Sequence, residues 1–210
     1  FIYDLLSSKI EKKIKFGGGG DYEGITLNGS TAYIVESNGT ITEVKNFQQP
    51  QFEVSIIETG LSAKQNIESI FMDSQQNRIL LAVKDKGIKK SSKGIYEYNL
   101  KNGKFRHQPV FRIELQDKIF SKIKEKKLSK VMSPSDLAIH PESGKIYILD
   151  GKDPKILIMS SNGDAEKIIT LNEDDFNQPE GITFSPSGKM YISNEGTPAN
   201  ILEIKLKETN

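Results

Sequence analysis

"PEGITFSPSGKMYISNEGTPANILEI", residues 179–204, contains the pattern that decides the fold. A carboxylate is followed by a short apolar run, a turn of the PSG type, a second run, another turn and a third run. Short runs rich in Ile, Tyr and Phe, bounded by Gly, Pro, Ser and Asn, are typical of antiparallel strands. The stretch therefore predicts three consecutive strands joined by turns.

Three earlier segments repeat this order of elements. They are YEGITLNGSTAYIVESNGTITEV from Tyr22, IESIFMDSQQNRILLAVKD from Ile67 and SDLAIHPESGKIYILDGKDPKILIM from Ser135. A fourth strand-like run follows each of them: FEVSIIET from Phe52, PVFRIEL from Pro109 and EKIITL from Glu166. Repeats of four short strands at a period of about 40–45 residues indicate the blades of a β-propeller. We expect an all-β fold, a single propeller domain over residues 1–210.

The number of blades depends on the N-terminal residues. FIYDL, residues 1–5, resembles the third strand GIYEYNL at 94–100, and KIEKKIKF, residues 9–16, resembles a fourth strand. These runs predict an N-terminal half-blade, and because the chain begins within the pattern we expect upstream residues to be missing. Four repeats and the half-blade predict five four-stranded blades, or six if a whole blade precedes the chain.

Each repeat carries an acid near the start of its first strand. Consecutive acids are 45, 68 and 44 residues apart, and the four acids are Glu23, Glu68, Asp136 and Glu180. The long interval requires an insertion, and ELQDKIFSKIKEKKLSKV at residues 114–131 supplies one. Because Leu115, Ile119 and Ile123 recur every four residues, the sequence predicts a helical insertion there.

Composition excludes several classes of function. The chain has 210 residues, 29 basic and 28 acidic, for a net charge of +1, so nothing in its charge favours nucleic acid or an anionic membrane as partner. No apolar run approaches 18 residues, which excludes a transmembrane helix. Cysteine is absent, which removes disulfides, thiolate nucleophiles and cysteine-ligated zinc. The two histidines, His107 and His140, form no zinc-ligand spacing and no Ser-His-Asp arrangement.

The glycine run in FGGGGDYEGITL, residues 16–27, leads into a strand. A phosphate-binding loop needs its glycines to open onto a helix N-terminus. We therefore interpret Gly17–Gly20 as a connector between blades, where glycine lets the chain turn.

Four stretches also carry a family resemblance: GDYEGITL, IESIFMDSQQNRILLAVKD, SPSDLAIHPESGKIYIL and QPEGITFSPSGKMYISNEG. Together they resemble the SdiA-regulated family of bacterial β-propellers, the YjiK-like group. The order of the motifs and the position of the expected insertion also agree with that family. The resemblance implies export to the cell envelope, as a periplasmic protein or a membrane-anchored lipoprotein, and an association with calcium.

The repeated acids are the candidate metal ligands. The first strand of each propeller blade lines the central channel, so Glu23, Glu68, Asp136 and Glu180 are expected around one channel mouth. Gathered carboxylates raise one another's pKa, and a hard cation such as Ca²⁺, which takes six to eight oxygen ligands, relieves the repulsion. The alternative is structural, with each acid bound to backbone N–H groups or paired with a lysine. Further acids and amides at the second-strand ends join the same rim or form turns: Glu36, Asp150, Asn194 and Glu195.

Two functions remain. The first is a monomeric envelope propeller that binds a small molecule or a protein on its channel face, with calcium holding that face in shape. The second is a metal-dependent hydrolase, similar to lactonases, whose channel-mouth Ca²⁺ polarises a carbonyl or activates water. Because the sequence shows no general base with a supporting partner, we favour the binding function.

Overall fold

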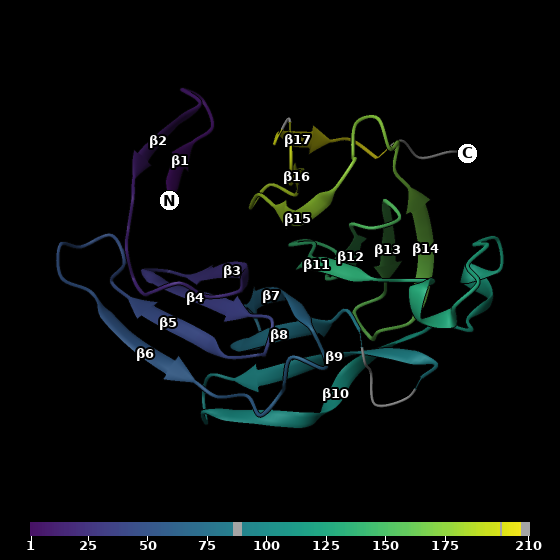
Figure 1. The fold of residues 1–210 in the computed structure, drawn as a ribbon, viewed down its shortest axis with the longest axis horizontal. Helices are drawn as coiled ribbons and strands as arrows, with labels where there is room; N and C mark the ends of the chain where they lie inside the picture. Colours follow the sequence, from purple (N-terminus) through teal and green to yellow (C-terminus); the bar gives the residue numbers. More distant parts are fainter. Residues whose placement is uncertain (86–89, 198, 207–210) are drawn as a thin grey trace.

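The computed structural model describes residues 1–85, 90–197 and 199–206, and these are almost entirely strands and turns (Figure 1). Four antiparallel sheets, called blades 1 to 4 here, follow one another in chain order. Blade 1 comprises β3 (Tyr22–Asn28), β4 (Thr31–Glu36), β5 (Ile41–Lys45) and β6 (Glu53–Ile57). Blade 2 comprises β7 (Ile67–Asp73), β8 (Arg78–Val83), β9 (Ser92–Asn99) and β10 (Lys104–Glu114). Blade 3 comprises β11 (Pro134–Ile139), β12 (Ile146–Asp150), β13 (Lys155–Met159) and β14 (Ala165–Thr170), and blade 4 comprises β15 (Pro179–Phe184), β16 (Met190–Asn194) and β17 (Ile201–Ile204).

The blades are arranged as in a β-propeller. Each blade is a meander in which neighbouring strands in the sequence pair with each other. The first strand of every blade is innermost, and β3, β7, β11 and β15 contact one another in turn (Figure 1). The space that these four inner strands line is called the channel below. The all-β propeller prediction is therefore confirmed.

The predicted blade number is wrong, because the structure has four blades and not five or six. Residues expected to form a fifth blade instead make a two-stranded hairpin of β1 (Ile2–Asp4) and β2 (Lys9–Lys12). Within the described residues this hairpin pairs with no other sheet. Every residue of β2 is exposed, and lysines on such a strand disfavour pairing at its edge. The similarity of these residues to strand sequences therefore predicted part of a blade, but the structure has only a hairpin here.

The predicted helical insertion at 114–131 is also wrong. The segment contains only two short 3₁₀ turns, η1 (Lys118–Phe120) and η2 (Leu128–Lys130). Lysines at positions 118, 122, 126 and 130 recur every four residues, and like charges at this spacing repel along one face of an α-helix. The apolar residues are buried without a helix, since Leu115 and Phe120 join the core between blades 2 and 3.

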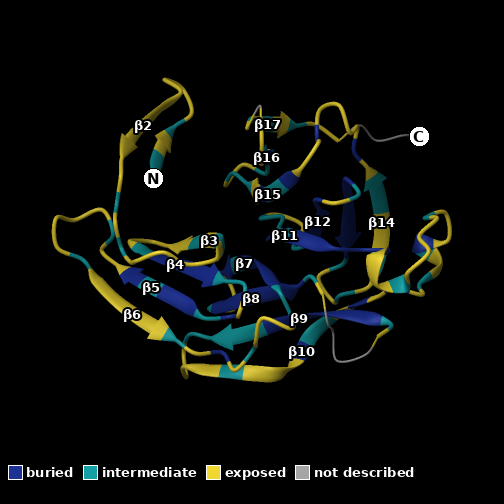
Figure 2. Cartoon of the chain, in the orientation of Figure 1, coloured by how far each residue is buried: buried dark blue, intermediate teal, exposed yellow. Residues whose placement is uncertain are grey.

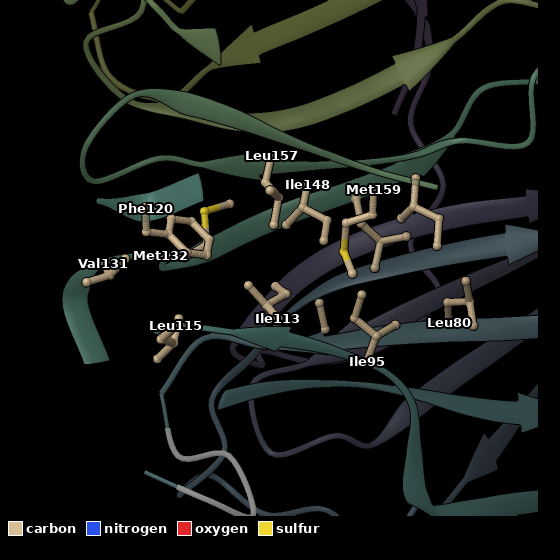
Figure 3. Close-up of a cluster of buried hydrophobic side chains, with 13 residues drawn as sticks. Leu80, Ile95, Ile113, Leu115, Phe120, Val131, Met132, Ile148, Leu157 and Met159 are labelled. Carbon is tan, nitrogen blue, oxygen red and sulfur yellow. The ribbon is translucent and has the colours of Figure 1, made fainter. Parts of the chain in front are cut away.

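The core lies between the blades. Middle strands such as β8, β12 and β13 are buried on both faces because neighbouring blades pack against them. The outer strands β6, β10 and β14 are mostly exposed or half-buried (Figure 2). Figure 3 shows the cluster between blades 2 and 3, where Leu80 and Ile95 from blade 2 accompany Ile148 and Leu157 from blade 3. Continuous apolar strands such as RILLAV in β8 are therefore explained by burial on two sides. No helix among the described residues has the length and apolar character needed to cross a membrane.

Candidate functional site

Each inner strand begins with a β-bulge. The register of the pairing shifts by one residue near the start of β3, β7, β11 and β15. The residues displaced by these bulges are Glu23, Glu68, Ser135 and Glu180. A bulge changes the direction in which a side chain points at the rim of a sheet. The equivalent of the three glutamates in blade 3 is therefore Ser135, and Asp136 lies one residue farther along its strand.

The three glutamates share one cavity at the end of the channel where the inner strands begin. This cavity, the mouth cavity, has a volume of about 550 Å³. Its charged lining residues are Glu23, Glu68, Lys84, Glu180 and Glu195. Four carboxylates thus surround a single ammonium group. The structure brings together three of the four predicted acids in this cavity, whereas Asp136 lines a neighbouring cavity together with Glu23 and Glu180.

Lys84 provides the charge balance that the sequence analysis did not predict. Its ammonium group forms an ion pair with Glu68, whose other oxygen accepts a hydrogen bond from the Asn66 amide at 2.8 Å. Burial acts to lower the pKa of Lys84, but the hydrogen bond and charge of Glu68 and the charges of Glu180 and Glu23 raise the pKa overall. Glu68 thus pairs with a lysine, which is the kind of contact that the structural alternative predicts.

Among the described residues, neither Glu23 nor Glu180 forms an ion pair with a lysine or an arginine. Burial, together with the charges of Glu68 and Asp21, raises the pKa of Glu23 to about 7. Burial also raises the pKa of Glu180, with the charges of Glu68 and Glu195 acting in the same direction and Lys84 opposing them. Both carboxylates are therefore positioned to gain from a cationic group that enters the cavity.

Asp136 holds three blades together. Its Oδ1 accepts hydrogen bonds from the Ser69 hydroxyl at 3.2 Å and from the Leu137 N–H at 2.8 Å, and its Oδ2 accepts one from the Ile182 N–H at 2.8 Å. Gly181 lies beside this contact, and a Cβ at that position would lie only 2.4 Å from the Ser193 hydroxyl oxygen. Burial raises the pKa of Asp136 to about 7 despite these hydrogen bonds. Two of the three donors are backbone N–H groups, the kind of contact that the structural alternative predicts.

A second cavity continues from the first along the channel. This cavity, the channel cavity, has a volume of about 380 Å³ and shares Glu23, Glu180 and Ser193 with the mouth cavity. Its remaining surface is mostly apolar and includes Ile25, Ile70, Phe71, Ile182 and Tyr191. A charged end and an apolar interior therefore meet at Glu23 and Glu180.

Two second-strand ends identified in the sequence take different roles. Asn194 and Glu195 line the mouth cavity, so they join the rim. Asp150 is fully buried, pairs with Lys155 at 2.7 Å and accepts the N–H groups of Lys152 and Asp153. It forms a turn. The alternation of polar and apolar residues along the strands does not distinguish a residue of the cavity rim from a residue of a turn.

Metal binding stays a prediction. Among residues 1–85, 90–197 and 199–206, no group of three or more His, Asp or Glu side chains is gathered closely enough to hold a metal ion. Glu68 is occupied by Lys84, and Asp136 by three hydrogen-bond donors. The arrangement described here therefore does not by itself supply the six to eight oxygen ligands that Ca²⁺ takes.

Comparison with solved structures finds similar folds at low sequence identity. A protein of unknown function from Bacteroides caccae has a TM-score of 0.55 and 10% identity, covering 99% of this chain and 65% of that chain. The major Malassezia sympodialis allergen Mala s 1 has a TM-score of 0.54 and 17% identity, covering 90% of this chain and 61% of that chain. A chain of the mitotic checkpoint complex has a TM-score of 0.53 and 12% identity, covering 96% of this chain and 67% of that chain. Such identities show a shared fold alone. This chain spans less than two thirds of the length of the Bacteroides caccae and allergen chains.

Sequence comparison is more specific. No curated protein matches the sequence at a significant level. A family model described as SdiA-regulated matches residues 6–204. Because this match covers most of the chain, the protein belongs to the SdiA-regulated family.

Proposed function

We propose that the protein is a binding module of the cell envelope that takes a cationic group, from a small molecule or a protein partner, at the mouth cavity. The observation that carries this proposal is the lining of that cavity by four glutamates and one lysine. The envelope location rests on the family resemblance. No catalytic step is part of this proposal.

Electrostatics supports a cation as the bound group. Glu23 and Glu180 both have a raised pKa, which shows that burial and neighbouring negative charge disfavour their ionised forms. A bound cation stabilises the ionised carboxylates, and the attraction is stronger in a partly dehydrated cavity than in bulk water. Binding should therefore release protons from the pocket or take place most tightly above about pH 7, where Glu23 is ionised.

Calorimetric titration of the purified chain with methylammonium and guanidinium chloride tests the proposal. We expect both cations to bind in competition, and Glu180→Gln to lower their affinity about tenfold by removing one charge. Glu53→Gln is the matched control, since Glu53 lies exposed in the outer strand β6. Equal affinity in the wild type and Glu180→Gln would contradict binding at the mouth cavity.

Calcium is tested in the same titration. Calcium binding that is lost in Glu180→Gln and retained in Glu53→Gln would make Ca²⁺ the cation of the mouth cavity. The hydrolase alternative is tested by following lactone and ester hydrolysis with and without Ca²⁺ in the same preparation. Turnover that Glu180→Gln abolishes would replace the binding proposal with a catalytic one.

A further inference from the structure

We propose that the ligand is an amphipathic primary amine, with its ammonium group in the mouth cavity and an alkyl or aryl body in the channel cavity. This inference rests on the proposed function and names the class of molecule that the same site recognises. Three features carry it: an unpaired buried acceptor, the junction of the two cavities, and the exposed apolar residues within the channel.

The first feature is Asn194, which lines the mouth cavity and is only 7% exposed. Its amide nitrogen donates to the Asp175 carbonyl oxygen and to the Asn200 side chain. Its Oδ1 is the buried side-chain atom that has no hydrogen-bond partner among the described residues. An unpaired buried acceptor is unfavourable and is satisfied by a donor brought by a ligand.

A primary ammonium group matches this set of acceptors. It carries three N–H donors and no acceptor. The mouth cavity offers carboxylate oxygens from Glu23 and Glu180, and Asn194 lines the same cavity. A metal ion has one carboxylate ligand fewer at this site, because Glu68 already forms an ion pair with Lys84. A quaternary ammonium group has no N–H to give to the carboxylates of Glu23 and Glu180, so the primary amine fits best.

The second and third features concern the rest of the ligand. The two cavities share Glu23 and Glu180, so a group bound to these carboxylates lies at the entrance to the channel cavity. Ile25 lines that cavity and is 65% exposed, although it belongs to an inner strand. Phe71 and Tyr191 add aromatic surface to the same wall. Covering exposed apolar surface of this kind is favourable and favours a ligand with a hydrocarbon body.

The test is a calorimetric comparison of hexylamine, methylamine and hexanol at pH 8. Each buried methylene strengthens binding about fourfold, so burial of only two predicts that hexylamine binds at least about tenfold more tightly than methylamine. Hexanol, which lacks the charge, should bind at least about tenfold more weakly than hexylamine. Equal affinity of the two amines would overturn this inference while leaving the proposed function intact. Hexanol binding as tightly as hexylamine, or no binding by either amine, would overturn both.

Two substitutions separate the parts of the site. Ile25→Ala should reduce the affinity for hexylamine about fourfold or more without changing that for methylamine. Ile56→Ala is the matched control, since Ile56 is 56% exposed on the outer strand β6. Glu180→Gln should weaken both amines alike. If Ile25→Ala and Ile56→Ala bind hexylamine as the wild type does, the hydrocarbon body does not lie in the channel cavity and the inference fails. Thermal unfolding without ligand shows whether each variant is folded.

Discussion

Asp136 should make the stability of the protein decrease as the pH rises from about 4 to 7. The surrounding blades raise its pKa from 3.8 to about 7. The folded protein therefore binds this proton more tightly than the unfolded chain does. For a raised carboxyl pKa the contribution to stability is complete below the unfolded value of 3.8 and is lost as the pH approaches the folded value.

The size of the effect follows from the shift. One pKa unit corresponds to about 1.4 kcal/mol, so a shift of about three units gives about 4 kcal/mol of pH-dependent stability. Asp136→Asn removes the titrating group and keeps an oxygen that can accept the Leu137 N–H. Between pH 4 and pH 8 the free energy of unfolding of the wild type should therefore fall by about 4 kcal/mol relative to this variant.

Urea denaturation at several pH values measures this difference. The chain has no tryptophan, so far-ultraviolet circular dichroism is the appropriate signal. Other carboxylates titrate alike in both proteins and cancel in the difference. Asp174→Asn, at an exposed position, is the matched control for the loss of one carboxylate. A constant difference between the wild type and Asp136→Asn from pH 4 to pH 8 would refute the reasoning. It would mean that the three hydrogen bonds, rather than burial, control the pKa of Asp136.

Three further substitutions test the packing around the channel. Lys84→Gln should destabilise the fold by about 2 kcal/mol by leaving Glu68 without its partner, less than for a fully buried pair because Lys84 is 27% exposed; unchanged urea midpoints would contradict this. Arg78→Lys should cost about 2–3 kcal/mol, since lysine cannot reproduce two 2.9 Å bonds to two carboxylates; equal thermal stability would count against it. Gly181→Ala places a Cβ 2.4 Å from the Ser193 hydroxyl, with an expected cost of about 1–2 kcal/mol; adding Ser193→Ala should recover most of it in a double-mutant cycle.

The propeller could be predicted because its signals are local. Turn residues such as Gly144 and Gly188 adopt positive φ angles of 67° and 80° between paired strands, and they stand at equivalent places in two repeats. The period of the repeats then indicates blades. Blade number is a different matter, because β1 and β2 form strands but, among the described residues, pair only with each other and leave Tyr3 and Ile10 exposed. Whether a strand joins a sheet depends on what it packs against, and the strand sequence alone does not contain that information.

The helix prediction failed for a related reason. Leu115 and Ile119 are spaced for one face of a helix, but the same spacing also suits a segment that packs irregularly against the core. Lysines repeated every four residues at 118–130 supplied the contrary signal. Isolated short helices are marginal unless packing supports them. Charge repulsion on the polar face therefore outweighs the apolar spacing on the other face.

The site was predicted in part, and the error has a specific origin. Glu23, Glu68 and Glu180 gather because each occupies a bulge, but Asp136 follows the bulge of its own strand. One inserted residue turns a side chain to a different direction. Aligning Pro134 with Pro179 would have matched Ser135 to Glu180 and revealed the offset.

The ion pair of Lys84 with Glu68 matters more for function than the displacement of Asp136. Four acids around one opening predict a metal only if nothing else neutralises them, because the repulsion is what a cation relieves. Lys84 belongs to the segment after β8, so its approach to Glu68 depends on the pairing of β7 with β8. With Lys84 already paired with Glu68, the carboxylates of Glu23, Glu180 and Glu195 remain to attract a cationic group. This remaining charge is the basis of our proposal that an organic cation binds at the mouth of the channel.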